Sequence, residues 1–350
     1  MRKYLLPEKG NFYKANLHCH TTISDGSMTP EEIKEAYTSH GYSVVAFTDH
    51  DVLIPHPELA DEKFLPLNAY EMEINEHYPR KPGSKTCHMC LIALEPDNVK
   101  QICFHRSKYL PGNTANYVSQ VKHDENEPDY EREYTGECIN NIMKKARDNG
   151  FFVTYNHPTW SREGHNDYNK YNFMHAMEVF NSECEVLGYF EYNEKDYDDM
   201  LANGKRIYCV ATDDTHSKEA CFGGFTMIKA EKLEYKAITD AMIAGNFYAS
   251  QGPEIHSLWI EDGRLHIECS GVKSIRFNTG IRRAKKIESC DGMLLNIAEF
   301  EVKPEDIYVR VTITDVTGKH AYTNAYFVDD LFEKEFDVKK HQTLYSKFLS

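Results

Sequence analysis

Two histidines that lie two residues apart, His18 and His20, follow the first apolar stretch of the chain. Alternate residues of a strand point to the same face, so an extended segment here directs both imidazoles to one side. Asp25 comes next, in a Ser-Asp-Gly turn that can direct its carboxylate to the same point. His50 follows the next apolar stretch, within the sequence Thr-Asp-His-Asp. Imidazole and carboxylate ligands without thiolates favour Zn, Mn or Fe, so these residues predict a transition-metal site.

A His-x-His pattern alone is weak evidence, because 17 histidines in 350 residues give about 0.8 such patterns by chance. By itself it is equally consistent with a solvated strand end that carries two ordinary histidines. Its weight comes from the residues that follow in order at or near apolar stretches, which are Glu71, His88, His157, Asp214 and His216. Glu73 would share a strand face with Glu71 and is the alternative carboxylate.

This ordered set resembles the polymerase and histidinol phosphatase (PHP) family of metal-dependent phosphoesterases. The family pattern has His-x-His, an Asp, a Thr-Asp-His-Asp-like strand end, Gly-x-Glu, a His in a buried strand, His-Pro and Asp-x-His. The chain departs from it at Ala69, where the family has glycine, and Glu71 is our choice for the bridging carboxylate. The nine positions of the pattern are filled by His18, His20, Asp25, His50, Glu71, His88, His157, Asp214 and His216.

The resemblance implies three divalent transition metals at three sites. The first site takes His18, His20, Glu71 and Asp214; the second takes Glu71, His88 and His157; the third takes Asp25, His50 and His216. The catalytic positions are Glu71, Asp214 and His216. Supporting positions are expected at Glu178, Asn181 and Asp213.

The resemblance also implies an activity, the hydrolysis of a small-molecule phosphoester by a metal-activated hydroxide. Metal binding can lower the pKa of water to about 7, and the cations neutralise charge that builds on the phosphoryl oxygens. Two alternatives remain open. One is hydrolysis of another ester, carboxylic or carbamate, and the other is a metal-binding assembly module without catalysis. The filled ligand set argues against the second alternative, because a degenerate site usually loses ligands.

The elements that position these residues predict an α/β fold. A strand before His18, a helix beginning after Thr29 and a strand over 43–47 form a strand-helix-strand unit, whose strand ends are where such folds place chemistry. Further strands are predicted over 63–70, 87–94, 151–155, 176–181, 205–211 and 223–229, and further helices over 135–149, 194–203 and 233–244. The resemblance implies a distorted (β/α)7 barrel over residues 1–250.

Residues 251–350 predict an appended antiparallel β-sandwich. Short alternating segments occur at 255–260, 265–269, 274–277, 307–313 and 321–328. This part has no catalytic set, so we interpret it as a packing or assembly domain. Its cations are interpreted as a solvated face, with a contribution to the metal site as the alternative; they are Arg276, Arg282, Arg283, Lys285 and Lys286.

The segment 95–135 is long for a connection, and it is rich in tyrosines and charged residues. It is longer than the connection usual in the family at this place. Two interpretations are held equally: a lid that selects the substrate, and a solvated insertion without a role.

The composition excludes several classes of protein. A formal net charge of −15 argues against a nucleic-acid surface, and it means that an anionic substrate needs metals or a local set of cations. The sequence has no apolar run of about 18 residues and no signal-peptide pattern, so no membrane partner is expected. Ten cysteines without a compact framework favour a reducing cytoplasm. The pair Cys87 and Cys90 has zinc-knuckle spacing but lacks a second pair.

Overall fold

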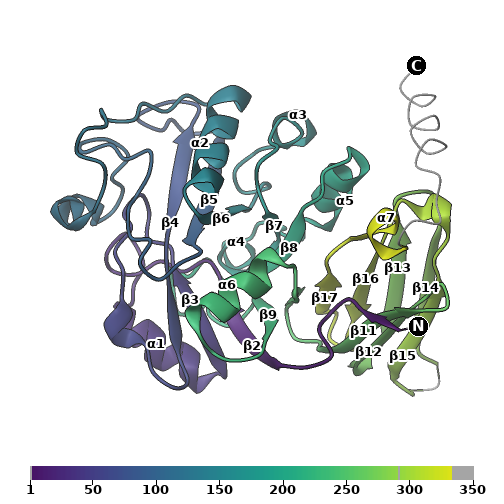
Figure 1. Cartoon of the computed structure of the whole chain (residues 1–350). Helices are drawn as coiled ribbons and strands as arrows, with labels where there is room; N and C mark the ends of the chain where they lie inside the picture. The colour runs from purple at the N-terminus through teal and green to yellow at the C-terminus, as the bar shows by residue number, and fades with distance from the viewer. Residues whose placement is uncertain (1, 291, 333–350) are drawn as a thin grey trace.

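The computed structural model of the chain describes residues 2–290 and 292–332. It has an α/β part that carries most of the helices and a β-rich part that also holds the amino-terminal end of the chain (Figure 1). The seven α-helices in the described residues are α1 (Pro30–Ser39), α2 (Gly136–Asp148), α3 (His165–Tyr168), α4 (Ser182–Val186), α5 (Glu194–Ala202), α6 (Tyr235–Ile243) and α7 (Val328–Leu331). None of them has the length and apolarity that crossing a membrane would require.

Most strands belong to one large mixed sheet. Its spatial order is β14 (Ala284–Glu288), β13 (Ser274–Thr279), β16 (Tyr308–Thr314), β17 (His320–Thr323), β10 (Phe247–Ser250), β9 (Phe225–Ala230), β2 (Asn11–Asn16), β3 (Tyr42–Phe47), β4 (Leu65–Asn75), β5 (Thr86–Ala93), β6 (Phe151–Tyr155), β7 (Ala176–Asn181) and β8 (Tyr208–Thr212), with β18 (Tyr326–Phe327) beside β16. A second sheet has the order β1 (Lys3–Tyr4), β11 (Ile255–Glu261), β12 (Arg264–Val272) and β15 (Leu295–Glu301). The predicted α/β class with a second, β-rich part is therefore confirmed.

The strand β5 departs from a strict alternation of strands and helices. β2, β3 and β4 are parallel to one another, and so are β6, β7 and β8, but β5 is antiparallel to both of its neighbours. The short connection 76–85 joins β4 to β5, and a parallel neighbour would need a crossover of a dozen or more residues. The sheet is therefore mixed.

The two ends of the run from β2 to β8 meet through the residues that follow these strands. The backbone N–H of Asp214 donates to the carbonyl of His18 at 2.9 Å, and that of His20 donates to Thr215 at 3.1 Å. Cys19 and Thr215 form a parallel bridge. Residues from opposite ends of the β2–β8 run thus lie side by side, and among them are three of the nine predicted ligands.

Several elements have the predicted bounds, and their local signals explain why. The helix α1 begins at Pro30 with a reciprocal capping box between Thr29 and Glu32. β6 and β7 coincide with the predicted strands. β4 is longer than predicted, because it stays paired with β5 as far as Asn75, so Glu71 lies inside the strand rather than after it. The strands β14 and β15 lie outside the predicted segments.

The β-rich part is built from both ends of the described chain. β1 pairs with β11, and β10 pairs with β9 on one side and β17 on the other, so the large sheet continues from one part into the other. Arg310 of β16 is 1% exposed and pairs with Asp198 at 2.7 Å and Glu194 at 2.8 Å, both on α5. An ion pair with these partners therefore joins the two parts.

Candidate metal centre

The structure brings the nine predicted ligands to one place. His18 and His20 follow β2, His50 follows β3, His157 follows β6 and Asp214 follows β8. The other four are Glu71 in β4, His88 in β5, Asp25 in the loop before α1 and His216 after β8. Because β5 is antiparallel to β4, the amino-terminal end of β5 lies beside the carboxyl-terminal half of β4, where His88 is opposite Glu73.

Glu71 lies at the centre of this group and is 1% exposed. Its Oε1 lies 3.2 Å from His18 Nε2, 3.2 Å from His88 Nδ1 and 3.3 Å from His157 Nε2. Its Oε2 lies 3.2 Å from His50 Nδ1 and 3.4 Å from the nearest nitrogen of His20. A carboxylate whose two oxygens face different sets of imidazoles has the arrangement needed to bridge two cations.

Asp214 is the second buried carboxylate of the centre. Its Oδ1 lies 3.1 Å from the Nε2 atoms of both His18 and His20, and 3.5 Å from His216 Nδ1. Asp214 and His157 have φ angles of 53° and 26°, in a region that non-glycine residues rarely adopt. Such backbone strain clusters at functional sites, where the surrounding structure holds it.

Asp25 forms the open side of the centre. Its carboxylate lies 3.4 Å from His216 Nε2 and 3.8 Å from nitrogens of His20 and His50. The Asp25 side chain is 37% exposed and that of His216 is 26% exposed, whereas Glu71 and His18 are fully buried. The centre is therefore most exposed to solvent at Asp25 and His216.

The ligand atoms of the centre are arranged to bind divalent cations rather than to form hydrogen bonds with one another. His18 Nε2 and His20 Nε2 lie 3.1 Å apart, although each ring already uses its Nδ1 in a hydrogen bond. Buried atoms without a hydrogen-bond partner include Glu71 Oε2, Asp214 Oδ1 and both ring nitrogens of His88. Native proteins rarely leave buried polar atoms unsatisfied. Candidate ligand atoms also lie within 4.8 Å of one another in several groups, which are His20, Asp25, His50 and His216; His18, His20 and Asp214; and His50, Glu71 and His88.

The pKa values of the centre reflect burial opposed by neighbouring charge. Burial acts to lower the pKa of His20, but its contacts with Asp214 and Glu71 raise it to about 10. Burial and the adjacent His20 lower the pKa of His50 to about 4. Burial acts to raise the pKa of Glu71, yet the surrounding imidazoles, first of all His18, hold it well below its usual range. The central carboxylate is therefore ionised at neutral pH.

Two of the three predicted supporting residues, Glu178 and Asn181, contact the ligands directly. Glu178 accepts a hydrogen bond from His18 Nδ1 at 2.7 Å and another from the backbone N–H of His157 at 3.0 Å. Asn181 donates to Glu178 and to Asp214 Oδ2. Asp213 accepts from the backbone of Gly224 and the hydroxyl of Tyr37, so it anchors a turn rather than facing the ligands.

Some residues near the centre were not predicted. Asn156 donates to Glu71 Oε1 at 2.8 Å and to Cys90 Sγ at 3.1 Å, and that thiol lies within 4.8 Å of ligand atoms of His18 and Glu71. The position of Asn156 one residue before the His-Pro pair is a local signal that could have identified it. Asp49, next to His50 in the sequence, accepts hydrogen bonds from the backbone and side chains of residues 21 and 24 and so shapes the loop that carries Asp25.

The segment 95–135 packs over two ligand-bearing loops. Arg132 is buried and pairs with Asp51 at 2.6 Å, next to His50. The backbone N–H of Asn113 donates to Ser24 at 2.7 Å, next to Asp25. Phe104 and Val121 form a small apolar cluster with residues 23 and 52. The segment is thus in contact with the open side of the centre.

The cations of the β-rich part have partners of their own. Arg276 pairs with Glu194, Arg283 pairs with Asp306, and Lys286 pairs with Glu288. Lys285 donates to a backbone carbonyl of β15. Within the described residues, neither these side chains nor Arg282 contacts any of the nine predicted ligands. This agrees with a role outside the centre.

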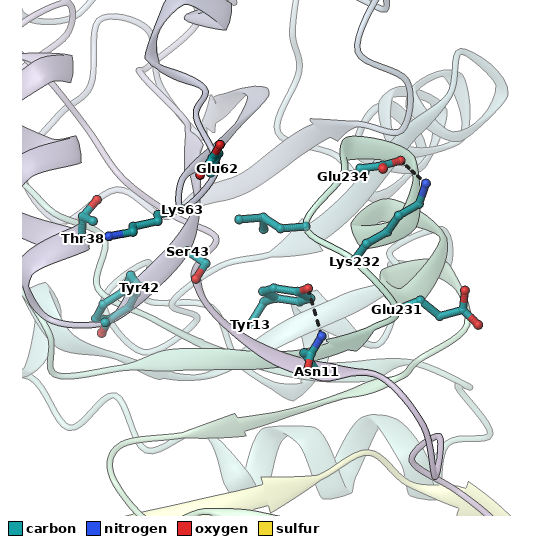
Figure 2. A pocket seen from close by; sticks show the side chains of 12 residues that line it. Asn11, Tyr13, Thr38, Tyr42, Ser43, Glu62, Lys63, Glu231, Lys232 and Glu234 are labelled. Carbon is teal, nitrogen blue, oxygen red and sulfur yellow. Dashed lines mark hydrogen bonds and ion pairs between the residues drawn. The ribbon is translucent and has the colours of Figure 1, made fainter.

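A hollow on the molecule lies at the other end of the strands (Figure 2). Asn11 and Tyr13 of β2, Tyr42 and Ser43 of β3 and residues 231–234 after β9 line it. These positions are at the amino-terminal ends of β2 and β3, whereas the predicted ligands follow the carboxyl-terminal ends. None of the nine ligands lines this hollow.

Comparison with known proteins identifies a family. The family model of the PHP domain matches residues 16–195, just over half of the chain. No match occurs among curated proteins. Among solved structures, the chain is similar to a two-domain protein containing a predicted PHP-like metal-dependent phosphoesterase from Bacteroides vulgatus ATCC 8482, with 15% identity, a TM-score of 0.44 and coverage of 92% of this chain and 98% of that chain. It is also similar to an amidohydrolase from Chromobacterium violaceum with bound sulfate and no metal, with 15% identity, a TM-score of 0.38 and coverage of 58% of this chain and 88% of that chain.

Proposed function

The chain belongs to the PHP family, and from this premise we propose that it is a metal-dependent phosphoesterase that hydrolyses a small-molecule phosphoester. The observation that carries the proposal is the position of Glu71, whose two carboxylate oxygens lie within 3.4 Å of nitrogens from five histidines on four segments. A buried, ionised carboxylate surrounded in this way needs cations to balance the unpaired donor atoms around it.

The proposed ligands form three groups around Glu71 and Asp214. They are His18, His20, Glu71 and Asp214; Glu71, His88 and His157; and Asp25, His50 and His216. The donor set of nitrogen and oxygen atoms suits Zn, Mn or Fe, and we propose three such ions. Transition metals bound there would supply Lewis acidity toward phosphoryl oxygens and lower the pKa of a bound water to about 7.

The chain's own residues fix the protons and the direction of approach. Glu178 holds the proton of His18 on Nδ1, which leaves the Nε2 lone pair facing Glu71 and Asp214. His216 Nδ1 donates to the carbonyl of Asp214 at 2.9 Å, so its Nε2 faces Asp25. We propose that the substrate enters on the Asp25 side and that Glu71, Asp214 and His216 are the catalytic positions.

We also propose how the fold divides. The strands β2 to β8 would form a seven-stranded distorted barrel, and the hydrogen bonds between residues 18–20 and 214–215 support its closure. Residues 1–250 would form the catalytic domain and residues 251–350 the accessory domain. The strand β1 belongs to the first range but pairs with β11 of the second.

The test is to purify the protein, measure its metal content and assay a chromogenic phosphomonoester, phosphodiester and carboxylic ester. We expect bound metal and turnover of a phosphoester that a chelator abolishes. Turnover of the carboxylic ester alone would replace the proposal by a different esterase. Metal without turnover of any of the three would favour a metal-binding module.

A further inference from the structure

Two arginines without carboxylate partners among the described residues lie on adjacent loops beside the metal centre. Arg80 belongs to the exposed connection 76–85 between β4 and β5, and Arg162 belongs to the loop after His157. The two loops touch, because a Cβ atom at Gly83 would lie 3.1 Å from Arg162 Nη1. The N–H of Thr86, the first residue of β5, also donates to Ser161 at 3.2 Å. The segments that carry Arg80 and Arg162 therefore lie side by side and form one rim.

The half-buried indole of Trp160 connects this rim to the ligands. Its ring centre lies 5.4 Å from that of His88 and 5.0 Å from that of His157, both in edge-on geometry. The guanidinium carbon of Arg80 lies over the same indole, 5.2 Å from its centre, as a cation–π contact. The backbone N–H of Trp160 donates to the buried Glu191, which fixes the loop. An anion bound to Arg80 would thus be separated from His88 and His157 by the indole ring of Trp160.

The free charge of these arginines is unusual for their surroundings. The chain has a formal net charge of −15, and arginines of the neighbouring segment 95–135 are neutralised at short distance, Arg106 by Asp129 and Arg132 by Asp51, each at 2.6 Å. A guanidinium that is held against an aromatic face, beside a metal centre and without a carboxylate, is available to a ligand. Its planar fork of donors matches the oxygens of phosphate and carboxylate.

We propose that Arg80 and Arg162 form a subsite for a second anionic group of the substrate, a phosphate or a carboxylate, next to the phosphoester that is hydrolysed. This inference rests on the proposed function and narrows its substrate class. The substrate is then a small phosphoester that carries a further phosphate or carboxylate, and Trp160 positions the arginine that recognises this second group.

A first experiment measures binding without turnover. Trp160 is one of two tryptophans, so the Trp259→Phe protein reports on Trp160 alone by its fluorescence. The protein with its metals in place is mixed with propane-1,3-diyl bisphosphate or with 3-phosphonooxypropanoate in a stopped-flow instrument, so that the fluorescence change is read before turnover. Arg80→Gln is expected to raise the apparent Kd about tenfold, the scale of a hydrogen bond to a charged group. Lys63→Gln is the matched control, because Lys63 lines the hollow at the far end of the strands. An equal Kd for the Arg80→Gln and parent proteins would overturn the subsite.

A second experiment compares kcat/KM for three esters, which are the two titrants and 3-hydroxypropyl phosphate, which lacks the second anion. The preference is the ratio of kcat/KM for an ester with a second anion to kcat/KM for 3-hydroxypropyl phosphate. In Arg80→Gln this ratio is expected to fall about tenfold. A fall confined to the bisphosphate would assign the group as phosphate, and one confined to the carboxylate as carboxylate. An unchanged preference would overturn the subsite while the phosphoesterase stands. If none of the esters is hydrolysed by the parent protein but Trp160 still reports Arg80-dependent binding, the proposed function fails and the subsite stands.

Discussion

Glu178 and His18 form a buried hydrogen bond in which Nδ1 of the imidazole donates to the carboxylate at 2.7 Å. The other oxygen of Glu178 accepts from the backbone of His157 and from Asn181, and Thr212 donates to the first oxygen. The carboxylate of Glu178 therefore acts as the acceptor in all four of these hydrogen bonds. It fixes the ring orientation of one proposed ligand and the backbone of another.

Glu178→Gln is expected to lower metal affinity about 10- to 100-fold, the usual range for a residue that orients a ligand. The glutamine amide would replace one carboxylate oxygen by an NH2 group, which would then face N–H or O–H donors that now donate to that oxygen. The affinity is measured by competition with a chelator. Glu163→Gln is the matched control, because Glu163 is also buried but, within the described part of the chain, its carboxylate accepts from tyrosine hydroxyls alone. Equal metal affinity in the two variants would contradict the role given to Glu178.

Glu71→Gln is expected to lose metal and turnover, whereas Glu73→Gln keeps its metal and turnover within about tenfold of the parent. Glu71 faces five imidazoles, but among the described residues the one imidazole within 4.0 Å of the Glu73 carboxylate is that of His88, at 3.5 Å. Glu73 also accepts a hydrogen bond from Asn75. Metal content and kcat are measured for both proteins. A metal-loaded, active Glu71→Gln protein beside an inactive Glu73→Gln protein would reverse the choice of bridging carboxylate.

The positions of His18, His20, His50 and His157 could be predicted from the sequence because each follows a strand that has its own local apolar signal. Parallel strands bring their carboxyl-terminal ends to one edge, so local patterns also imply which residues meet. The direction of β5 was not predicted, because it depends on the 76–85 connection and on pairing with β4 and β6. The same holds for Arg132 with Asp51 and for Arg310 with Asp198, since partners so far apart in the chain leave no local pattern.

Arg132→Met is expected to destabilise the protein by about 3–5 kcal/mol, because it leaves the carboxylate of Asp51 buried without its cation. Both side chains of this pair are 2% exposed. The free energy of unfolding is measured by chemical denaturation. Arg106→Met, in the same segment, removes a pair whose side chains are more than a third exposed and should cost much less. Comparable losses in the two variants would show that burial does not decide the cost.

Gly112→Ala is expected to raise KM while metal content stays unchanged. Gly112 has a φ of 59°, and a Cβ there would lie 2.3 Å from the carbonyl oxygen of Ser24, so the segment 95–135 must move away from the loop that carries Asp25. Gly41→Ala has a similar positive φ but open space around its Cβ, and it controls for backbone strain. If KM is the same in both variants, the segment is a solvated insertion rather than a lid.

Removal of residues 254–350 is expected to cost stability before chemistry, because all nine proposed ligands precede residue 217. The cut removes β17 from the edge of β10 and removes Arg310 from Glu194 and Asp198 on α5. It also exposes apolar surface, and each Å² of lost burial costs about 25 cal/mol.

We therefore expect the truncated chain to be poorly soluble, with metal bound in whatever fraction folds, as measured by metal content of the soluble protein. Arg310→Met in the full chain separates the ion pair from the loss of the sheet. It should lower stability by less than Arg132→Met does while metal binding persists, because the carboxylates it leaves behind, Glu194 and Asp198, are 22% and 32% exposed. A stable, metal-loaded truncation without activity would instead show that the β-rich part supplies a substrate contact. Arg282 would then be the first residue to test, because Arg283 is held by Asp306.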